Sequence, residues 1–260
     1  SRHEANQDPL SSGISGTYAQ PTGVNRPGIS AILRAPATRA RRSRSAPTIE
    51  ALGSNMFDII YLLEMIGIVA FAISGMIVAR SKNMDPVGVF TIGFITALGG
   101  GTLRDLMMDN HPLYWIKHQE QPILILAMAI VFSYWRRAER LKESRIVFPD
   151  AIGLGIFSIL GAQLALDLGH SWFIASLLGV MTGTFGGALR DTLCNEVPFI
   201  FRKDQIYASI SFAGCWVYFL CQWLLTSESL ALTIGLLFIV VVRMLAVRFD
   251  IRLQRDPVQP

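Results

Sequence analysis

The sequence is poor in charged residues. Asp, Glu, Lys and Arg make up only 16% of its 260 residues, whereas about 25% is usual in soluble globular domains. Hydrophobic residues account for 52% of the chain, and the mean hydropathy is +0.43. The net charge of +4 is spread over an N-terminal tail and short loops. This distribution argues against a soluble protein and against nucleic-acid binding, which needs a concentrated basic surface.

Motifs for catalysis and metal binding are also missing. The three cysteines lie in or beside apolar segments and form no CxxC pair, so no disulfide or metal framework is predicted. The four histidines lie in the tail and in loops and form no ligand cluster. HExxH, GxSxG and GxxxxGK[ST] do not occur. We therefore expect no enzyme, no cofactor, no metal site and no ATP coupling within this chain.

What the chain has instead is a series of long apolar segments. A helix needs about 20 apolar residues to cross ~30 Å of hydrocarbon. Segments of this kind predict an all-α integral membrane protein with seven transmembrane helices. Their expected spans are 57–79, 86–108, 121–136, 149–168, 171–194, 204–225 and 229–248. The third is the weakest prediction, because its apolar run is short.

Residues 1–55 differ in character from the rest. They are rich in Ser, Gly, Pro, Ala and Arg, a composition that favours disorder. Met56 is the first methionine, and the hydrophobic pattern begins directly after it. We expect an extension outside the membrane domain, which would span 56–255. The alternative is a targeting segment, since 34–44 is rich in Arg and Ser and has no acidic residue.

The membrane domain contains an internal duplication. Residues 99–105 read GGGTLRD, and residues 185–191 read FGGALRD, 86 positions later. The acidic Glu64 pairs with the acidic Asp150 by the same offset. Further identical pairs at this offset are Ile66/Ile152, Gly67/Gly153, Phe71/Phe157, Ile73/Ile159, Gly75/Gly161, Ala79/Ala165, Gly93/Gly179, Thr96/Thr182, Pro112/Pro198 and Lys117/Lys203. In a membrane protein such a repeat is typical of a transport path.

Loop charges predict the orientation of the two copies. Lys and Arg gather after the first, third, fifth and last spans, whereas the loops between carry only Lys117. The positive-inside rule places the C-terminus in the cytoplasm and the start of the domain outside. Each copy, 57–136 and 149–225, holds three spans. The second copy should therefore be inverted relative to the first, with 229–248 as an extra helix.

The glycines of the repeated phrase allow two interpretations. Gly99, Gly100 and Gly101 in one copy, and Gly186 and Gly187 in the other, cost helix propensity. They permit a bend whose freed carbonyls line a pore, or they allow another helix to approach closely. The polar residues on the same segments are further candidates for the path; they are Thr96, Thr102 and Thr182.

Ionisable residues within spans are expensive unless they are paired or hydrated. The candidates for cation attraction are Asp105, Asp191, Glu64 and Asp150. Because neighbouring helical residues do not face each other, we expect Arg104 not to bond to Asp105, nor Arg190 to Asp191. Each arginine instead pairs across helices with Glu64 or Asp150, or extends to the membrane interface.

These motifs resemble a bacterial membrane family of two tandem domains named for glycine transport, related to the trimeric intracellular cation (TRIC) channels. The matching segments are 83–85, 97–105, Pro112, 115–116 and 186–191. The resemblance implies seven helices, inverted three-helix repeats, and a homotrimer with one pore per protomer, lined by helices bent at the glycines. It implies permeation of monovalent cations, chiefly K⁺ with Na⁺ as a second candidate, across the bacterial inner membrane.

Two other functions remain open from the sequence. A secondary carrier for glycine or another small amino acid would use inverted repeats equally well. A membrane scaffold without transport would use the glycines only to pack helices. Flux of K⁺, Na⁺ and glycine separates the three hypotheses.

Overall fold

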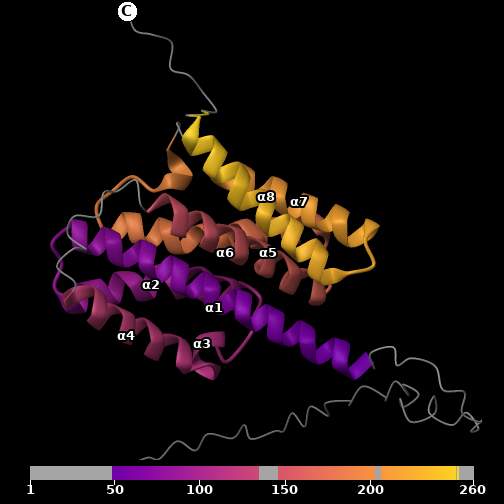
Figure 1. Ribbon diagram of the computed structural model, residues 1–260, viewed down its shortest axis with the longest axis horizontal. Helices are drawn as coiled ribbons and strands as arrows, with labels where there is room; N and C mark the ends of the chain where they lie inside the picture. The colour runs from indigo at the N-terminus through magenta and orange to yellow at the C-terminus, as the bar shows by residue number, and fades with distance from the viewer. Residues whose placement is uncertain (1–48, 135–145, 203–205, 250, 252–260) are drawn as a thin grey trace, which may run out of the picture. The chain divides into compact units, whose positions relative to one another are not determined.

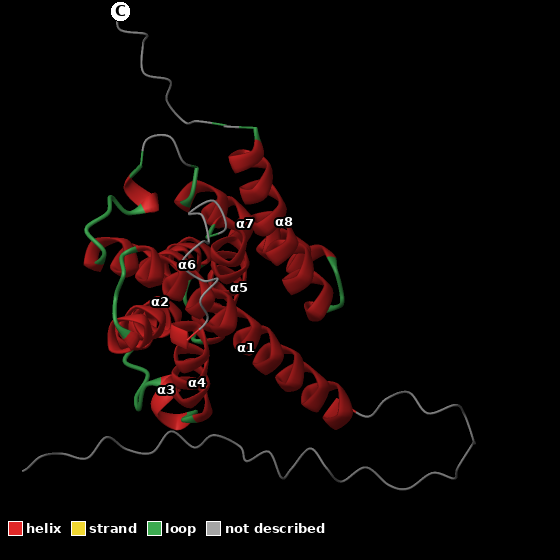
Figure 2. Ribbon diagram, turned by 60° about the vertical axis from the view of Figure 1, so that its left-hand side comes forward, coloured by secondary structure: helices red, strands yellow, loops and turns green. Residues whose placement is uncertain are grey.

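Helices alone form the described part of the chain. The computed structural model describes residues 49–134, 146–202, 206–249 and 251, all within one unit, Pro47–Pro260. Within them, Figure 2 shows helices and connecting loops and no strand. The helices are α1 (Ile49–Ser81), α2 (Pro86–Met107), α3 (Tyr114–Lys117), α4 (Glu120–Tyr134), α5 (Val147–Asp167), α6 (Trp172–Leu193), the 3₁₀ helix η4 (Phe199–Phe201), α7 (Ala208–Leu224) and α8 (Glu228–Arg248).

Each of the seven predicted spans is helical. Five helices are long and apolar enough to cross a membrane: residues Ile59–Ser81 of α1, and α2, α5, α6 and α8. The apolar helices α4 and α7 are shorter, at 15 and 17 residues. At 1.5 Å per residue these two reach only about 22 and 25 Å. The predicted domain boundary at Met56 falls inside α1, which begins at Ile49, and residues 1–48 lie outside the described residues.

The two copies begin and end their helices in the same way. Asp85 caps α2 by accepting a hydrogen bond from the Gly88 amide, and Ser171 caps α6 by accepting one from the Ile174 amide. These caps are equivalent by the 86-residue offset. Residues in the left-handed region also recur at equivalent places, namely Asn83 and Gly169, and Asp109 and Asn195. Asn, Asp and Gly adopt this conformation at low cost, so the turns repeat although their residues differ.

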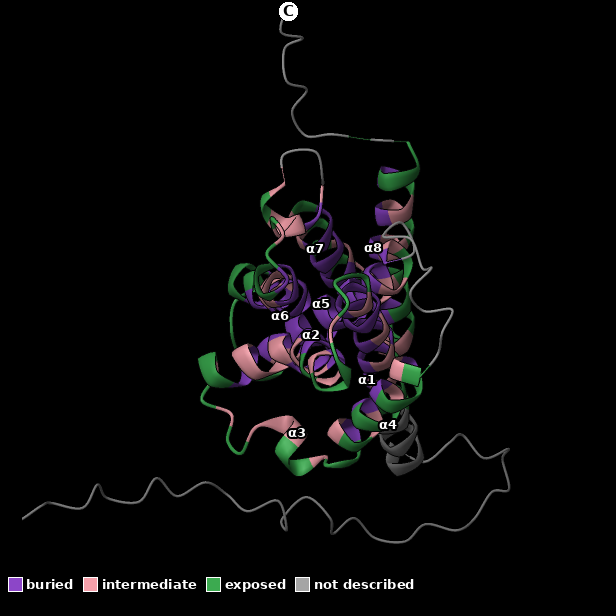
Figure 3. Cartoon of the chain, turned by 90° about the vertical axis from the view of Figure 1, so that its left-hand side faces the viewer, coloured by how far each residue is buried: buried purple, intermediate pink, exposed green. Residues whose placement is uncertain are grey.

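Equivalent helices of the two copies pack on each other. α1 contacts α5 and α2 contacts α6, while α7 and α8 cover α5. Figure 1 shows α5 and α6 between the first copy and the α7–α8 pair. Figure 3 shows the buried residues on the facing sides of the helices, and α5 is buried along nearly its whole length. The equivalent rings of Phe71 and Phe157 stack at 5.5 Å between α1 and α5.

Candidate functional site

The repeated glycines hold α2 and α6 in direct backbone contact. A Cβ at Gly100 would overlap the Thr182 carbonyl oxygen, and a Cβ at Gly186 would overlap the Thr96 carbonyl oxygen. Both contacts join positions that exchange under the repeat offset. α2 and α6 run without interruption through Gly99–Gly101 and Gly186–Gly187. In the described residues Gly100 and Gly186 therefore serve close helix packing, and both helices stay α-helical through the glycines.

The second copy contains a connected network of buried charges, in which Arg190 Nη2 alone has no hydrogen-bond partner among the described residues. Arg190 and Asp150 are almost completely buried. Arg190 Nη1 donates to Asp150 Oδ1 at 2.7 Å, and Arg190 Nε donates to Asp191 Oδ1 at 2.7 Å. The Tyr207 hydroxyl donates to Asp150 Oδ2 at 2.9 Å. One guanidinium thus serves two carboxylates, and Ser74 of the first copy accepts a further hydrogen bond from it.

The first copy is built from equivalent residues but is joined differently. Arg104 Nε and Nη2 both donate to Asp105 Oδ1, at 2.9 and 2.8 Å. Glu64 is 7% exposed and lies beside the Tyr114 side chain. Burial raises the pKa of Tyr114, and the neighbouring Glu64 raises it further, so the phenol stays neutral. Among the described residues Glu64 forms no ion pair within 4 Å.

These contacts correct one prediction and confirm part of another. Adjacent Arg and Asp do bond in both copies, because the long arginine side chain reaches the next carboxylate where both groups are shielded from water. The predicted pairing across helices is confirmed for Arg190 with Asp150. Extension of the arginines to the interface is wrong, since Arg104 is 6% exposed and Arg190 is 0% exposed.

The aspartates of the repeated phrase also hold the loops that follow. Asp105 Oδ2 accepts from the Tyr114 amide at 2.9 Å, and Asp191 Oδ2 accepts from the Phe199 amide at 3.1 Å. These amides open the short helices α3 and η4, which sequence analysis missed. A carboxylate at a helix N-terminus satisfies free N–H groups. The paired prolines at 112 and 198 were the signal that a common turn follows each phrase.

The three candidate threonines donate to their own helices. Thr96 and Thr182 donate to the carbonyls of Ile92 and Leu178, each at 2.6 Å, and Thr102 donates to Leu98 at 2.8 Å. Such bonds leave only the oxygen lone pairs for another partner. Thr102 Oγ1 also accepts from Trp115 Nε1 at 3.1 Å.

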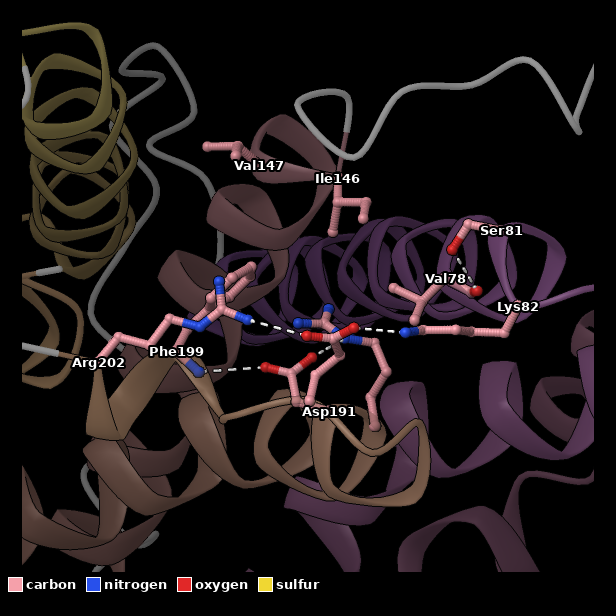
Figure 4. A pocket seen from close by; sticks show the side chains of 10 residues that line it. Val78, Ser81, Lys82, Ile146, Val147, Asp191, Phe199 and Arg202 are labelled. Atoms are coloured by element: carbon pink, nitrogen blue, oxygen red, sulfur yellow. Dashed lines mark hydrogen bonds and ion pairs between the residues drawn. The ribbon is translucent and has the colours of Figure 1, made fainter. Parts of the chain in front are cut away.

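Two cavities adjoin the two charge centres. One of about 20 Å³ lies beside Glu64 and Arg104 in the first copy, and its wall includes Gln121. The other, of about 210 Å³, lies beside Arg190 and Asp191 in the second copy. Figure 4 shows Lys82 and Arg202 extending into this second cavity from opposite sides. Lys82 bonds to Glu196 there and lowers the pKa of Glu196, mainly by that hydrogen bond and also by its charge.

Three neutral residues that lie beside the buried acids were not predicted from the sequence. Tyr114, Tyr207 and Gln121 lie outside the repeated phrase, and the residue type changes between equivalent positions: Gln121 is equivalent to Tyr207. Only the offset from known acidic positions could have indicated them. Within the described residues no group of three or more His, Cys, Asp or Glu could hold a metal ion.

Buried ionisable groups inside a bundle of apolar helices are typical of membrane proteins with an internal path for ions or solutes. The family model described as glycine transporter matches residues 61–137 and again 147–223. The chain belongs to this family, as the sequence predicted. A UPF0126 membrane protein of Vibrio cholerae is 34% identical over 75% of this chain and 82% of its own length. The UPF0126 inner membrane protein YadS of Escherichia coli is 32% identical over 75% of this chain and 95% of its own length.

Solved TRIC cation channels share the fold. One, used to explain conductance, is 35% identical with a TM-score of 0.68, covering 76% of this chain and 98% of its own. The TRIC orthologue from Rhodobacter sphaeroides is 31% identical with a TM-score of 0.69, covering 74% of this chain and 99% of its own. These relatives are membrane proteins and channels and not enzymes, which confirms that prediction. The relatives named as inner membrane proteins and the membrane-spanning helices agree on a membrane location.

Proposed function

We propose that this protein is a homotrimeric channel for monovalent cations, chiefly K⁺, with one polar path in each protomer. The observation that carries this proposal is the similarity to TRIC cation channels at 31–35% identity over 98–100% of their length. Identity at this level extends beyond a shared fold. The family description as glycine transporter makes glycine the competing solute.

Reciprocal contacts support an inverted arrangement of the two copies. Gly100 contacts Thr182 and Gly186 contacts Thr96. From Thr96 to Gly100 the chain of α2 ascends one turn, while its contacts in α6 descend one turn, so the two helices are antiparallel. α1 and α5 follow the same rule, because Gly67 meets Phe157 and Gly153 meets Phe71. Antiparallel contact between equivalent helices is what a pseudo-twofold axis in the membrane plane produces.

Contacts between distant loops support seven crossings. Lys82 after α1 bonds to Glu196 after α6. Tyr61 near the start of the apolar part of α1 bonds to Glu120 at the start of α4, at 3.3 Å, and Gln163 near the end of α5 bonds to Glu228 at the start of α8, at 2.8 Å. With seven crossings, both members of each pair lie on one side of the membrane. The positive-inside rule makes the Lys82 side cytoplasmic.

The proposed path runs between the copies and joins the two cavities. Glu64 and Asp105 border the external end, and Asp191 borders the cytoplasmic end. The α2–α6 crossing and the Phe71–Phe157 stack lie between them. Conduction requires these contacts to separate, and the glycines at the crossing let the two helices slide or bend at low steric cost.

Flux through purified protein in liposomes tests the proposal. We expect fast K⁺ flux, slower or equal Na⁺ flux and no glycine uptake, with unitary currents in planar bilayers. Uptake of glycine coupled to an ion gradient would establish the carrier instead. Absence of all three fluxes would favour the scaffold.

The predicted orientation has its own test. Cysteines introduced by Arg140→Cys and Glu228→Cys, in a background lacking the three native cysteines, should react from opposite sides of intact membranes. Position 140 should label only after the cytoplasmic side is opened, because its loop is rich in Lys and Arg. Labelling of both positions from one side would contradict the inverted repeats.

A further inference from the structure

The acid of the first copy lacks the cation that its counterpart has. Asp150 receives both the Tyr207 hydroxyl and the Arg190 guanidinium. Glu64, at the equivalent position, lies beside the Tyr114 side chain, while the Arg104 guanidinium donates to Asp105. Two carboxylates thus share one guanidinium in each copy, but only in the second does it bond to both. Within the described residues, Glu64 is therefore the one acid of the two centres that bonds to no guanidinium.

A cavity lies where the missing partner would be. It measures about 20 Å³ and is bordered by Glu64, Thr102, Tyr114 and Gln121; Arg104 and Asp105, which are bonded to each other, also lie in its wall. A space of this size holds about one water-sized particle. A bare K⁺ or Rb⁺ ion is of that size, whereas a glycine molecule, with five heavy atoms, is too large.

Gln121 supplies the second, independent observation. It is 0% exposed, and neither its amide oxygen nor its amide nitrogen has a hydrogen-bond partner in the structure. Buried amides are almost always satisfied, so an unpaired one in a cavity wall indicates a bound species. Gln121 is equivalent to Tyr207, whose hydroxyl bonds to Asp150 in the second copy. The shorter side chain of Gln121 leaves open the space that the tyrosine ring fills.

We propose that this cavity binds one dehydrated monovalent cation between the Glu64 carboxylate and the Gln121 amide oxygen. The proposal rests on the proposed channel function and specifies where its external end holds the permeating ion. The cation neutralises Glu64 as Arg190 neutralises Asp150. Oxygen donors from Glu64, Gln121 and Tyr114 replace part of its hydration shell, as carbonyl and carboxylate oxygens do in selectivity filters. A divalent ion is a poor fit, because Asp105 is already bonded to Arg104 and only Glu64 is left to offset a double charge.

Binding of Rb⁺ to the full chain in lipid nanodiscs tests the site. Equilibrium dialysis at constant ionic strength, with N-methylglucamine as the replacement cation, should show one Rb⁺ per chain. Glu64→Gln should weaken binding about tenfold to a hundredfold, the worth of one charged interaction. Glu120→Gln removes the same charge from an exposed neighbour of the site and should leave binding unchanged. Anomalous diffraction from Rb⁺-soaked crystals should place the ion beside Gln121.

Gln121→Tyr gives the first copy the residue that the second copy has at the equivalent position. It keeps the test decisive if Glu64→Gln fails to fold. It fills the cavity and should abolish binding, while gel filtration reports normal assembly. No Rb⁺ on the wild-type chain, or wild-type affinity in either variant, would overturn the proposal and leave an ordered water as the occupant. K⁺ flux through the wild-type protein separates the two ideas. Flux without Rb⁺ binding refutes only the site, and Rb⁺ binding without flux refutes only the channel.

Discussion

The two copies of one sequence phrase carry the same charges and use them differently. In the second copy Arg190 bridges Asp150 and Asp191, and Arg243 of α8 lies 4.9 Å from the ring of Tyr207 in the same cluster. In the first copy Arg104 bonds to Asp105 alone, and a cavity separates Glu64 from the unpaired Gln121. The motif therefore fixes the Arg–Asp pair, and the surrounding helices decide whether the remaining acid is neutralised internally.

The extra helix contributes to this difference. α8 packs on α5 and α7, both of the second copy. Phe199 lies beneath three guanidinium groups, those of Arg190, Arg202 and Arg243, at 5.3, 4.7 and 5.9 Å from its centroid. Such contacts favour a packed and rigid centre. The proposed cation site thus lies in the copy that lacks this packing.

The largest expected loss of stability comes from removing the charge of Asp150, the acid that Arg190 contacts. Asp150→Asn leaves the buried Arg190 with one carboxylate instead of two and should destabilise the fold by about 3 to 5 kcal/mol. Glu64→Gln should cost only about 1 kcal/mol, because no guanidinium depends on Glu64. Unfolding of both variants in detergent, titrated with denaturant, measures the difference. Equal losses would show that the two acids are equivalent and would remove the asymmetry.

The glycine crossing should give the next largest effect. Gly100→Ala places a Cβ against the Thr182 carbonyl, a backbone atom that cannot move away cheaply, and should cost about 3 kcal/mol and reduce assembly. Gly101→Ala is the matched control. Its Cβ would meet only Arg104 Nη2, at 3.9 Å, and alanine adds helix propensity of up to about 1 kcal/mol. If both variants assemble and unfold alike, close approach is not what Gly100 provides.

The aromatic stack tests the symmetry itself. Phe71→Leu and Phe157→Leu each remove one ring from the same pair and should each cost about 1 kcal/mol. Because the two positions are related by the repeat and lose the same ring contact, we expect the two losses to be nearly equal. A clear inequality in unfolding free energy would mean that the two copies diverge even at the centre.

The sequence predicted the architecture better than the site. Length and hydropathy located the long helices within four residues at either end, because an apolar segment of that length has few other folds available. The exception is the start of α1, at Ile49, eight residues before the predicted start at 57. The 86-residue offset also identified which acids and arginines matter. It could not identify which of these residues bond to each other. Arg104 reaches Asp105 through a flexible side chain, and helical periodicity does not predict such a contact. Gln121 was not predicted, because what distinguishes it is a buried amide without a hydrogen-bond partner. Only the packing of the helices shows this.

The smallest expected effect concerns an ion pair that joins the copies on one side only. Lys82 and Glu196 bond to each other, whereas their repeat equivalents are Leu168 and Asn110. Because Lys82 lowers the pKa of Glu196, the pair stabilises the protein above the ordinary carboxyl pKa of 4.5, and this stability is lost as the pH falls through the lowered value. Both side chains are about one-third exposed, which keeps the contribution small. Thermal midpoints of the wild type and of Glu196→Gln should differ slightly near pH 7 and converge in acid. A difference that persists or grows at low pH would show that Glu196 acts through Arg202 or through packing. The ion pair with Lys82 would then not be what joins the two copies on this side.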